Sequence, residues 1–146
     1  MAIYSAAIDA ISLSAASAKT IMELAAASTD RARLIQWSVD FNGVAPTAIP
    51  VLVELARASG AITGTGVTEV KWDPADGANT VAASHTASGE GTMTDVLETH
   101  RVHPQSGILI QYPLGREPYI AASGLLRIRC TAAASVSATV TMIWEE

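Results

Sequence analysis

Cysteine, aromatic residues and charged residues are all scarce in this chain of 146 residues. The single cysteine, Cys130, cannot form a disulfide within the chain. A domain of this size buries about 70% of the surface that its unfolded chain exposes, so it needs no disulfide for stability. Cys130 lies in the alternating run LLRIRCTA (125–132), with no His or Asp beside it. We therefore expect a buried thiol that behaves as a small apolar residue.

Charge is low and weighted towards the acidic side. Charged residues make up 16% of the chain and the net charge is -5. A typical soluble domain has about 25% charged residues. The nine basic residues are scattered, whereas a nucleic-acid surface needs clustered Lys and Arg. We therefore expect no nucleic-acid partner.

Long apolar runs are also missing. No segment reaches the about 18 consecutive apolar residues of a membrane span, so no membrane partner is expected. The first residues, MAIYSAAIDAISLS, have no basic cluster and include Asp9 within their apolar part. This pattern differs from that of a signal peptide, and it predicts synthesis and assembly in the cytoplasm.

The scarcity of charge predicts a neutral surface rich in alanine, serine and threonine. Aromatic residues total 5%, although the apolar fraction is 49%. A free monomer generally carries more surface charge, which keeps it soluble. A neutral surface suits a protein that is covered by copies of itself or by a larger partner.

The dominant pattern from Asp30 onward is a period of two. Apolar and polar side chains alternate in residues 31–41, 50–59, 125–132 and 135–144. Such alternation is typical of antiparallel strands with one packed face and one solvated face. Further strands are expected in TVAASHT (80–86), MTDVLETHRVH (93–103) and GILIQYP (107–113).

Turn-forming residues separate these strands. They occur in FNGVAPTAIP (41–50), SGAITGTG (59–66), DPADGAN (73–79), SGEG (88–91), HPQSG (103–107), LGREP (114–118) and TAAAS (131–135). Short strands joined by turns, without helical segments between them, predict a sandwich or barrel. We expect one all-β domain over residues 1–146, an antiparallel β-sandwich or jelly roll of about eight strands.

The first 28 residues allow two interpretations. The segment SAASAKTIMELAAAS (14–28) is rich in Ala and includes Met, Glu, Leu and Lys, all of which favour a helix. Alternation in IYSAAIDAI (3–11) and TIMELAA (20–26) favours strands instead, and we adopt that interpretation. A short helix within residues 14–27 is the alternative.

No motif for catalysis or metal binding is evident. His100 and His103 are three residues apart on an expected strand and point to opposite faces, and His85 adds no suitably spaced ligand. The chain has no G-x-S-x-G motif, and the glycine pairs in GTGVTEV (64–70) and GEGT (89–92) read as loops. We expect no enzymatic activity, metal or cofactor. The paired carboxylates of a glycosidase can be distant in sequence, which keeps a small β-sandwich enzyme as an alternative.

The run VKWDPADGAN (70–79) concentrates Asp, Asn, Pro and Gly beside a tryptophan. An EF-hand loop needs oxygen ligands at alternate positions and a distant Glu, and this run has neither. Asp73 and Pro74 fit the first two positions of a type I turn, and Asp76 with Gly77 supplies a second pair of turn residues. We expect a turn in which the aspartate caps backbone amides.

The order of these motifs resembles the small jelly-roll decoration, or cement, proteins of tailed-bacteriophage heads. The resemblance lies in MAIYSAAI (1–8), ELAAASTDRARLIQWSVDFNG (23–43), VLVELARASGAITGTGVTEVKWDPADGANTVAAS (51–84), REPYIAASGLLRIRC (116–130) and ATVTMIWEE (138–146). It extends over nearly the whole chain as a pattern of strands and loops.

The resemblance implies a structural role on the outside of a capsid. Proteins of that family bind an expanded icosahedral shell, usually as trimers at threefold positions, and clamp the major capsid protein. It implies a homotrimer on the virion exterior, with residues 1 to about 15 as a segment that docks on the shell or on a neighbouring protomer. We expect the interface to include Ile3, Tyr4, Ile8, Trp72, Asp73, Pro74, Asp76 and Tyr119.

A receptor-binding or glycan-binding jelly roll of a tail or head fibre is the main alternative. Such a site needs exposed aromatic residues near Asp, Asn or Arg. Tyr112, Tyr119 and Trp72 are the aromatic residues close to loops. A core or interface role is the reading that we adopt for each of them.

Overall fold

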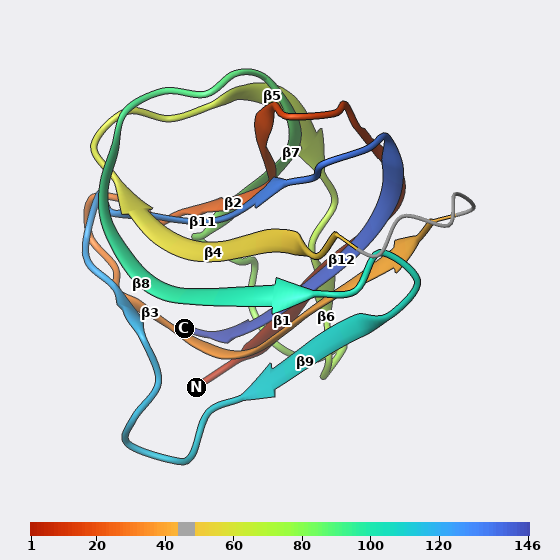
Figure 1. Cartoon of the computed structure of the whole chain (residues 1–146). Helices are drawn as coiled ribbons and strands as arrows, with labels where there is room; N and C mark the ends of the chain where they lie inside the picture. Colours follow the sequence, from red (N-terminus) through yellow and green to blue (C-terminus); the bar gives the residue numbers. More distant parts are fainter. Residues whose placement is uncertain (44–48) are drawn as a thin grey trace.

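The computed structural model describes residues 1–43 and 49–146, and all regular structure within them is β (Figure 1). The expected all-β fold is therefore confirmed. The turn expected in residues 41–50 lies partly outside the described residues, which exclude 44–48. No helix in the described part of the chain has the length and apolar character needed to cross a membrane. The strands are β1 (Ile3–Leu13), β2 (Ala18–Ala25), β3 (Ala32–Asn42), β4 (Val51–Ala58), β5 (Thr63–Val67), β6 (Val70–Lys71), β7 (Ala82–Gly89), β8 (Met93–Val102), β9 (Gly107–Gln111), β10 (Tyr119–Ile120), β11 (Leu125–Thr131) and β12 (Val136–Glu145).

Two antiparallel sheets form a sandwich. Sheet I has the order β10–β3–β12–β1–β6, and β9 pairs with the same edge of β3 as β10 does. Sheet II has the order β5–β7–β2–β11–β4–β8. The first and last strands of the chain, β1 and β12, are neighbours in the middle of sheet I.

Eight of the strands have jelly-roll connectivity. Strands β1, β12, β3 and β9 are consecutive neighbours in sheet I, and β2, β11, β4 and β8 are consecutive neighbours in sheet II. This arrangement, in which the chain passes repeatedly between two four-stranded sheets, is that of a jelly roll. The described residues add four strands to this core: β5, β6 and β7 between β4 and β8, and β10 between β9 and β11. The expected number of about eight strands therefore holds for the core alone.

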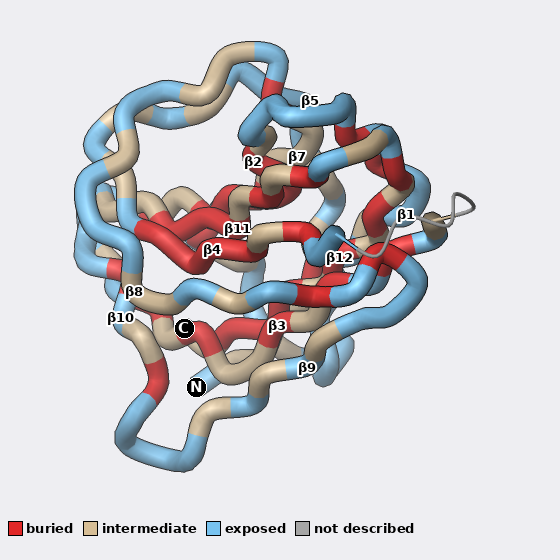
Figure 2. Tube along the Cα trace, viewed as in Figure 1, coloured by how far each residue is buried: buried red, intermediate tan, exposed pale blue. Residues whose placement is uncertain are grey.

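The space between the sheets is filled by the apolar positions of the alternating strands. Figure 2 shows buried positions along β2, β11 and β4, in the middle of sheet II. Trp37 of β3 and Trp144 of β12 are the largest fully buried side chains, and they belong to one hydrophobic core with Leu126 and Ile128 of β11. The strands expected in residues 31–41, 50–59, 125–132 and 135–144 are all present.

The amino-terminal region is made of strands, as we expected, and the alternative helix within residues 14–27 is absent from it. β1 pairs with β12, and β2 lies between β7 and β11. Residues 20–24 of β2 are all buried, on both faces of the sheet. Burial on both faces needs apolar or paired side chains at consecutive positions, which explains why this strand does not alternate cleanly.

One sequence interpretation was wrong. GTGVTEV (64–70) and SGAITGTG (59–66) were read as loops, but residues 63–67 form β5, the edge strand of sheet II, which pairs with β7. Four of its five residues are exposed, so the strand carries no apolar alternation. Its pairing with β7 is a tertiary contact that local composition does not indicate.

Candidate functional site on the outer face of sheet I

Sheet I presents one broad face to solvent. Cross-strand pairing sets residues of four strands, with the residue that follows β6, in one row on this outer face. The row is Trp72, Ile3, Glu145, Arg33 and Tyr119, with the Trp72 amide donating to the Ile3 carbonyl at 3.0 Å. Its members alternate along their strands with the buried residues Tyr4, Trp144, Leu34 and Ile120. Strand register therefore places three of the interface residues expected from the sequence, Ile3, Trp72 and Tyr119, in one row of the outer face.

The two neighbouring rows on the outer face carry uncharged side chains. The second row is Val70, Ser5, Ile143, Gln36 and Gln111, and the third is Ala7, Thr141, Ser38 and Leu109. Large apolar side chains stand at the two edges of this face: Trp72 is 60% exposed, Leu109 59% and Tyr119 50%. The second and third rows are thus uncharged and bordered by exposed apolar residues, whereas the next row carries Asp9 and Asp40 beside Thr139.

One ion pair lies in the first row, between the exposed aromatic residues. The Arg33 guanidinium contacts the Glu145 carboxylate, and both side chains are partly buried. Desolvation, the largest single effect, lowers the pKa of Arg33, but the charge and hydrogen bond of Glu145 together with the charges of Tyr119 and Glu117 outweigh it and raise that pKa above its usual value. Because the two charges neutralise each other, this row adds no net charge to the face.

Two of the expected interface residues lie on the inner face instead. Tyr4 is 2% exposed, and its ring stacks on that of Trp144 with centroids 6.2 Å apart. The Tyr4 hydroxyl donates a hydrogen bond to the Gly77 carbonyl at 3.1 Å. Ile8 packs against the core. We therefore assign both residues to the support of the face and leave them out of its contact surface.

The segment that follows β6 is the turn that its composition predicts. The Asp76 amide donates to the Asp73 carbonyl at 3.0 Å, and the Ala75 amide donates to Oδ1 of Asp73 at 2.9 Å, with Pro74 at the second position. Lys71 Nζ donates to the Asp76 carbonyl at 2.7 Å. The turn at the edge of sheet I, next to Trp72, is thus held by hydrogen bonds and contains Asp73, Pro74 and Asp76. This confirms the predicted cap by an aspartate.

A polar cluster that sequence patterns did not indicate lies between the strands β8 and β3. Trp37 Nε1 donates to the Tyr112 hydroxyl at 3.0 Å, and that hydroxyl donates to Glu98 at 2.7 Å. His100 Nε2 lies 3.2 Å from the other oxygen of Glu98. Desolvation, then the hydrogen bond to Glu98, raises the pKa of Tyr112 far above its usual value. The cluster links the edge strand of sheet II to sheet I, and its histidine is held in a structural contact.

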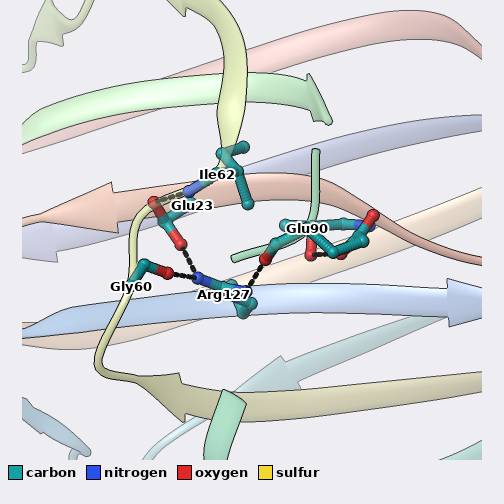
Figure 3. A network of polar contacts seen from close by, with 6 residues as sticks. Glu23, Gly60, Ile62, Glu90 and Arg127 are labelled. Carbon is teal, nitrogen blue, oxygen red and sulfur yellow. Dashed lines mark hydrogen bonds and ion pairs between the residues drawn. The ribbon is translucent and has the colours of Figure 1, made fainter. Parts of the chain in front are cut away.

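A second polar network holds the insertion between β4 and β8 against sheet II (Figure 3). Arg127 of β11 and Glu23 of β2 are an ion pair on the outer side of that sheet, and both are almost fully buried. Arg127 also donates to the carbonyls of Gly60, at 2.6 Å, and Glu90, and the Ile62 amide donates to Glu23 at 3.1 Å. The segments 59–62 and 90–92 cross over the sheet here, so the network fixes the path of the insertion.

Cys130 and His103, the other side chains that could take part in chemistry, have structural roles. Cys130 is buried and free, as expected, and desolvation raises the pKa of its thiol well above the usual value. His103 follows the end of β8, and its Nδ1 accepts a hydrogen bond from the Gln105 amide at 3.2 Å. In residues 1–43 and 49–146, no three His, Cys, Asp or Glu side chains are grouped so that they could hold a metal ion.

Comparison with known proteins gives no family: no protein-family model matches the chain, and no curated protein is significantly similar to it. Function has to be argued from the site itself. Of the residues on the outer face, the sequence indicated Ile3, Trp72 and Tyr119. Val70 and Leu109 were missed. Leu109 lies within residues 104–115, which contain no charged residue. This absence of charge was the sequence feature that could have indicated an exposed apolar residue there.

Proposed function

We propose that this protein is a capsid decoration protein that binds the outside of a bacteriophage shell as an oligomer, a trimer, and stabilises the mature form of the shell. Two independent lines support the proposal: the sequence resemblance to such proteins and the outer face of sheet I. A protein that binds only the mature lattice stabilises it by mass action, and many copies add their contributions.

The observation that carries the proposal is the row from Trp72 to Tyr119. It spans four strand spacings, about 19 Å, and it joins two exposed aromatic residues through a neutralised ion pair. Along β12, ten residues long, the face extends about 33 Å. The product, about 600 Å² for the whole outer face including the row with Asp9 and Asp40, approaches the about 800 Å² that each partner buries in a stable protein interface.

The amino-terminal segment contributes to this face through its side chains. Residues 3–13 are β1, which pairs with β12 over most of its length, so they are not a free docking arm. Ile3, Ser5 and Ala7 point to the outer face, where their lack of charge suits contact with the major capsid protein or a sister protomer. Deletion of residues 1–15 would remove an inner strand of sheet I, so point substitutions on the outer face are the better probe.

The proposal is tested by co-sedimentation with phage heads from a mutant that lacks this protein. We expect saturable binding to expanded heads and no binding to unexpanded procapsids. Light scattering coupled to size-exclusion chromatography should give the mass of a trimer. Equal binding to both kinds of particle, or to neither, would refute a role in stabilising the mature shell.

A glycan-binding role is the competing proposal, and the exposure of Trp72 beside Asp73 is the observation in its favour. Against it, Tyr112 is engaged by Trp37 and Glu98, and Trp72 and Tyr119 stand about 19 Å apart. They cannot stack on the two faces of one sugar ring. Binding of a monomer to a glycan array, without binding to heads, would favour this alternative.

A further inference from the structure

Strand β9 is an edge strand without the usual protection. It pairs with β3 on one side, and no described residue pairs with its other side. Natural edge strands generally carry charges, prolines or bulges that prevent association with another strand. β9 has none of these: its sequence is GILIQ, its pairing with β3 shows no register shift, and residues 104–115 carry no charge.

The hydrogen-bond pattern shows which backbone groups face the free edge. The Phe41 amide donates to Ser106 at 2.9 Å, and the Tyr112 amide donates to Ile35 at 3.0 Å. In an antiparallel ladder, residues that bond to the partner alternate with residues whose amide and carbonyl point away from it. Gly107, Leu109 and Gln111 therefore direct both groups outward. All three are exposed.

We propose that this edge binds the β9 strand of a second copy of the chain, antiparallel, across a twofold axis at Leu109. In that register Leu109 lies opposite its own counterpart, and Gly107 lies opposite Gln111 in both directions. All three outward-facing residues then meet outward-facing residues, and each pair can exchange two backbone hydrogen bonds. Few registers pair all the outward-facing amide and carbonyl groups of β9 at once. This register does so, and it uses the same surface on both copies, as a twofold contact requires.

The side chains beside the edge fit the same register. A side chain on Gly107 would collide with Oδ1 of Asp40, so the Asp40 carboxylate lies over the glycine. The residue placed opposite Gly107 is Gln111 of the second copy, whose amide can donate to that carboxylate. The two copies thus present an acceptor and a donor to each other at each end of the paired strands.

The lack of charge in residues 104–115 matters more for a second copy than for any other partner. Twofold pairing sets the same short edge against itself, so an edge with charges of one sign would bring like charges together. Strand β8, at the edge of sheet II, carries Asp95, Glu98 and Arg101. Pro113 follows β9 in the outward-facing series, and its missing amide hydrogen limits the pairing at that end.

Cysteine cross-linking tests the proposal directly. Opposed residues of a bonded pair have Cα atoms about 5.5 Å apart, which suits a disulfide. Leu109→Cys should form a disulfide-linked dimer under mild oxidation, and Leu114→Cys is the matched control. Leu114 is 89% exposed and Leu109 only 59%, so random collisions would link the control faster. We expect L109C to link at least about ten times faster, and equal rates or the reverse order would overturn the proposal. Cross-linking through the native cysteine is low because Cys130 is buried.

A charge test addresses the register. Gln111→Glu places a carboxylate beside Asp40 of the other copy, and sedimentation equilibrium should show about tenfold weaker association. Asp40→Asn in the same chain removes that repulsion, so the double variant should recover the association of the unaltered protein. Circular dichroism confirms that each variant is folded. Unchanged association of Q111E, or no recovery in the double variant, would exclude this register. A twofold contact cannot lie within a threefold trimer, so this pairing joins a protomer of one trimer to a protomer of another. The pairing does not depend on capsid binding, so both tests use the protein alone.

Discussion

Arg127 and Glu23 form an ion pair that is buried although it lies on the outer side of a sheet. The segments 59–62 and 90–92 cross above it and exclude water, and Arg127 binds a backbone carbonyl from each of them. A buried charge that loses its partner costs far more than an exposed one. The pair therefore couples the position of the insertion to the stability of sheet II.

Glu23→Gln should lower the free energy of unfolding by about 3–5 kcal/mol, because it leaves the Arg127 charge buried without its counter-ion. Glu54→Gln is the matched control on the same sheet, since the Glu54–Arg129 pair is more exposed. It should cost about 1 kcal/mol. Urea denaturation followed by fluorescence measures both. Similar losses of stability in the two variants would show that burial of the Glu23–Arg127 pair has no special effect.

Gly91→Ala should destabilise the crossing segments. Gly91 has a φ of +59°, and a methyl group there would lie 2.6 Å from the Ala61 carbonyl oxygen and would also collide with that of Gly60. We expect a loss of about 1–3 kcal/mol, measured by thermal or urea unfolding. Gly66→Ala, in the same insertion, meets open space and should change stability by less than about 0.5 kcal/mol. A neutral G91A would show that the two segments can move apart freely.

Trp72→Ser should reduce binding to expanded phage heads at least about tenfold, because it removes the largest exposed apolar side chain of the outer face. Stability should change little, since Trp72 lies at the edge of sheet I. Val96→Ser, on β8 of the other sheet, also removes an exposed apolar side chain and should bind as the unaltered protein does. Co-sedimentation measures occupancy, and equal loss in both variants would count against the outer face of sheet I.

Stability should fall as the pH rises through the alkaline range. Desolvation raises the pKa of Cys130 and of Tyr112 in the folded protein, and the hydrogen bond to Glu98 adds to the effect on Tyr112. The folded state therefore holds protons that the unfolded state releases, above about pH 8.5 for a cysteine and about pH 10 for a tyrosine. Their contribution is complete below these values and is lost above them, with a slope of at most about 1.4 kcal/mol per pH unit for each group.

Urea midpoints from pH 7 to 11 measure this dependence. Cys130→Ala should remove the part of the slope that begins near pH 8.5, although the cavity also lowers stability at every pH. Tyr112→Phe should reduce the part that begins near pH 10 and leave the contribution of Tyr4, whose pKa is also raised by desolvation. A decline that is the same in both variants would show that other groups cause it.

Much of the fold could be predicted from the sequence because most strands are buried on one face only. Such strands alternate, and the alternation in residues 31–41, 50–59 and 135–144 located β3, β4 and β12. β2 is harder, because burial on both faces leaves a run of helix-forming residues with little alternation. β5, β6 and β10 are short additions whose pairing depends on distant strands, and β5 was mistaken for a loop.

The candidate site could be predicted only in part. Ile3, Trp72 and Tyr119 could be named, but their common row depends on pairing between strands far apart in the chain. Period-two alternation alone could have excluded Tyr4 from the interface that contains Ile3. Adjacent residues of a strand point to opposite faces, so Ile3 and Tyr4 cannot both contact a partner through one face. The polar groups around Arg127 come from four separate segments, and no local pattern joins them.

The place of β12 also governs when the protein can fold. β12 separates β1 from β3 in sheet I, so the two strands made earlier have no direct contact in the sheet without it. A ribosome therefore has to release residues 136–145 before the centre of sheet I can form. Until then the apolar sides of β1 and β3 are without their partner, and nascent chains on one messenger are close enough to pair wrongly. Because β12 lies between β1 and β3, we expect the sandwich to close only after β12 is available, and non-local pairing of this kind generally folds slowly.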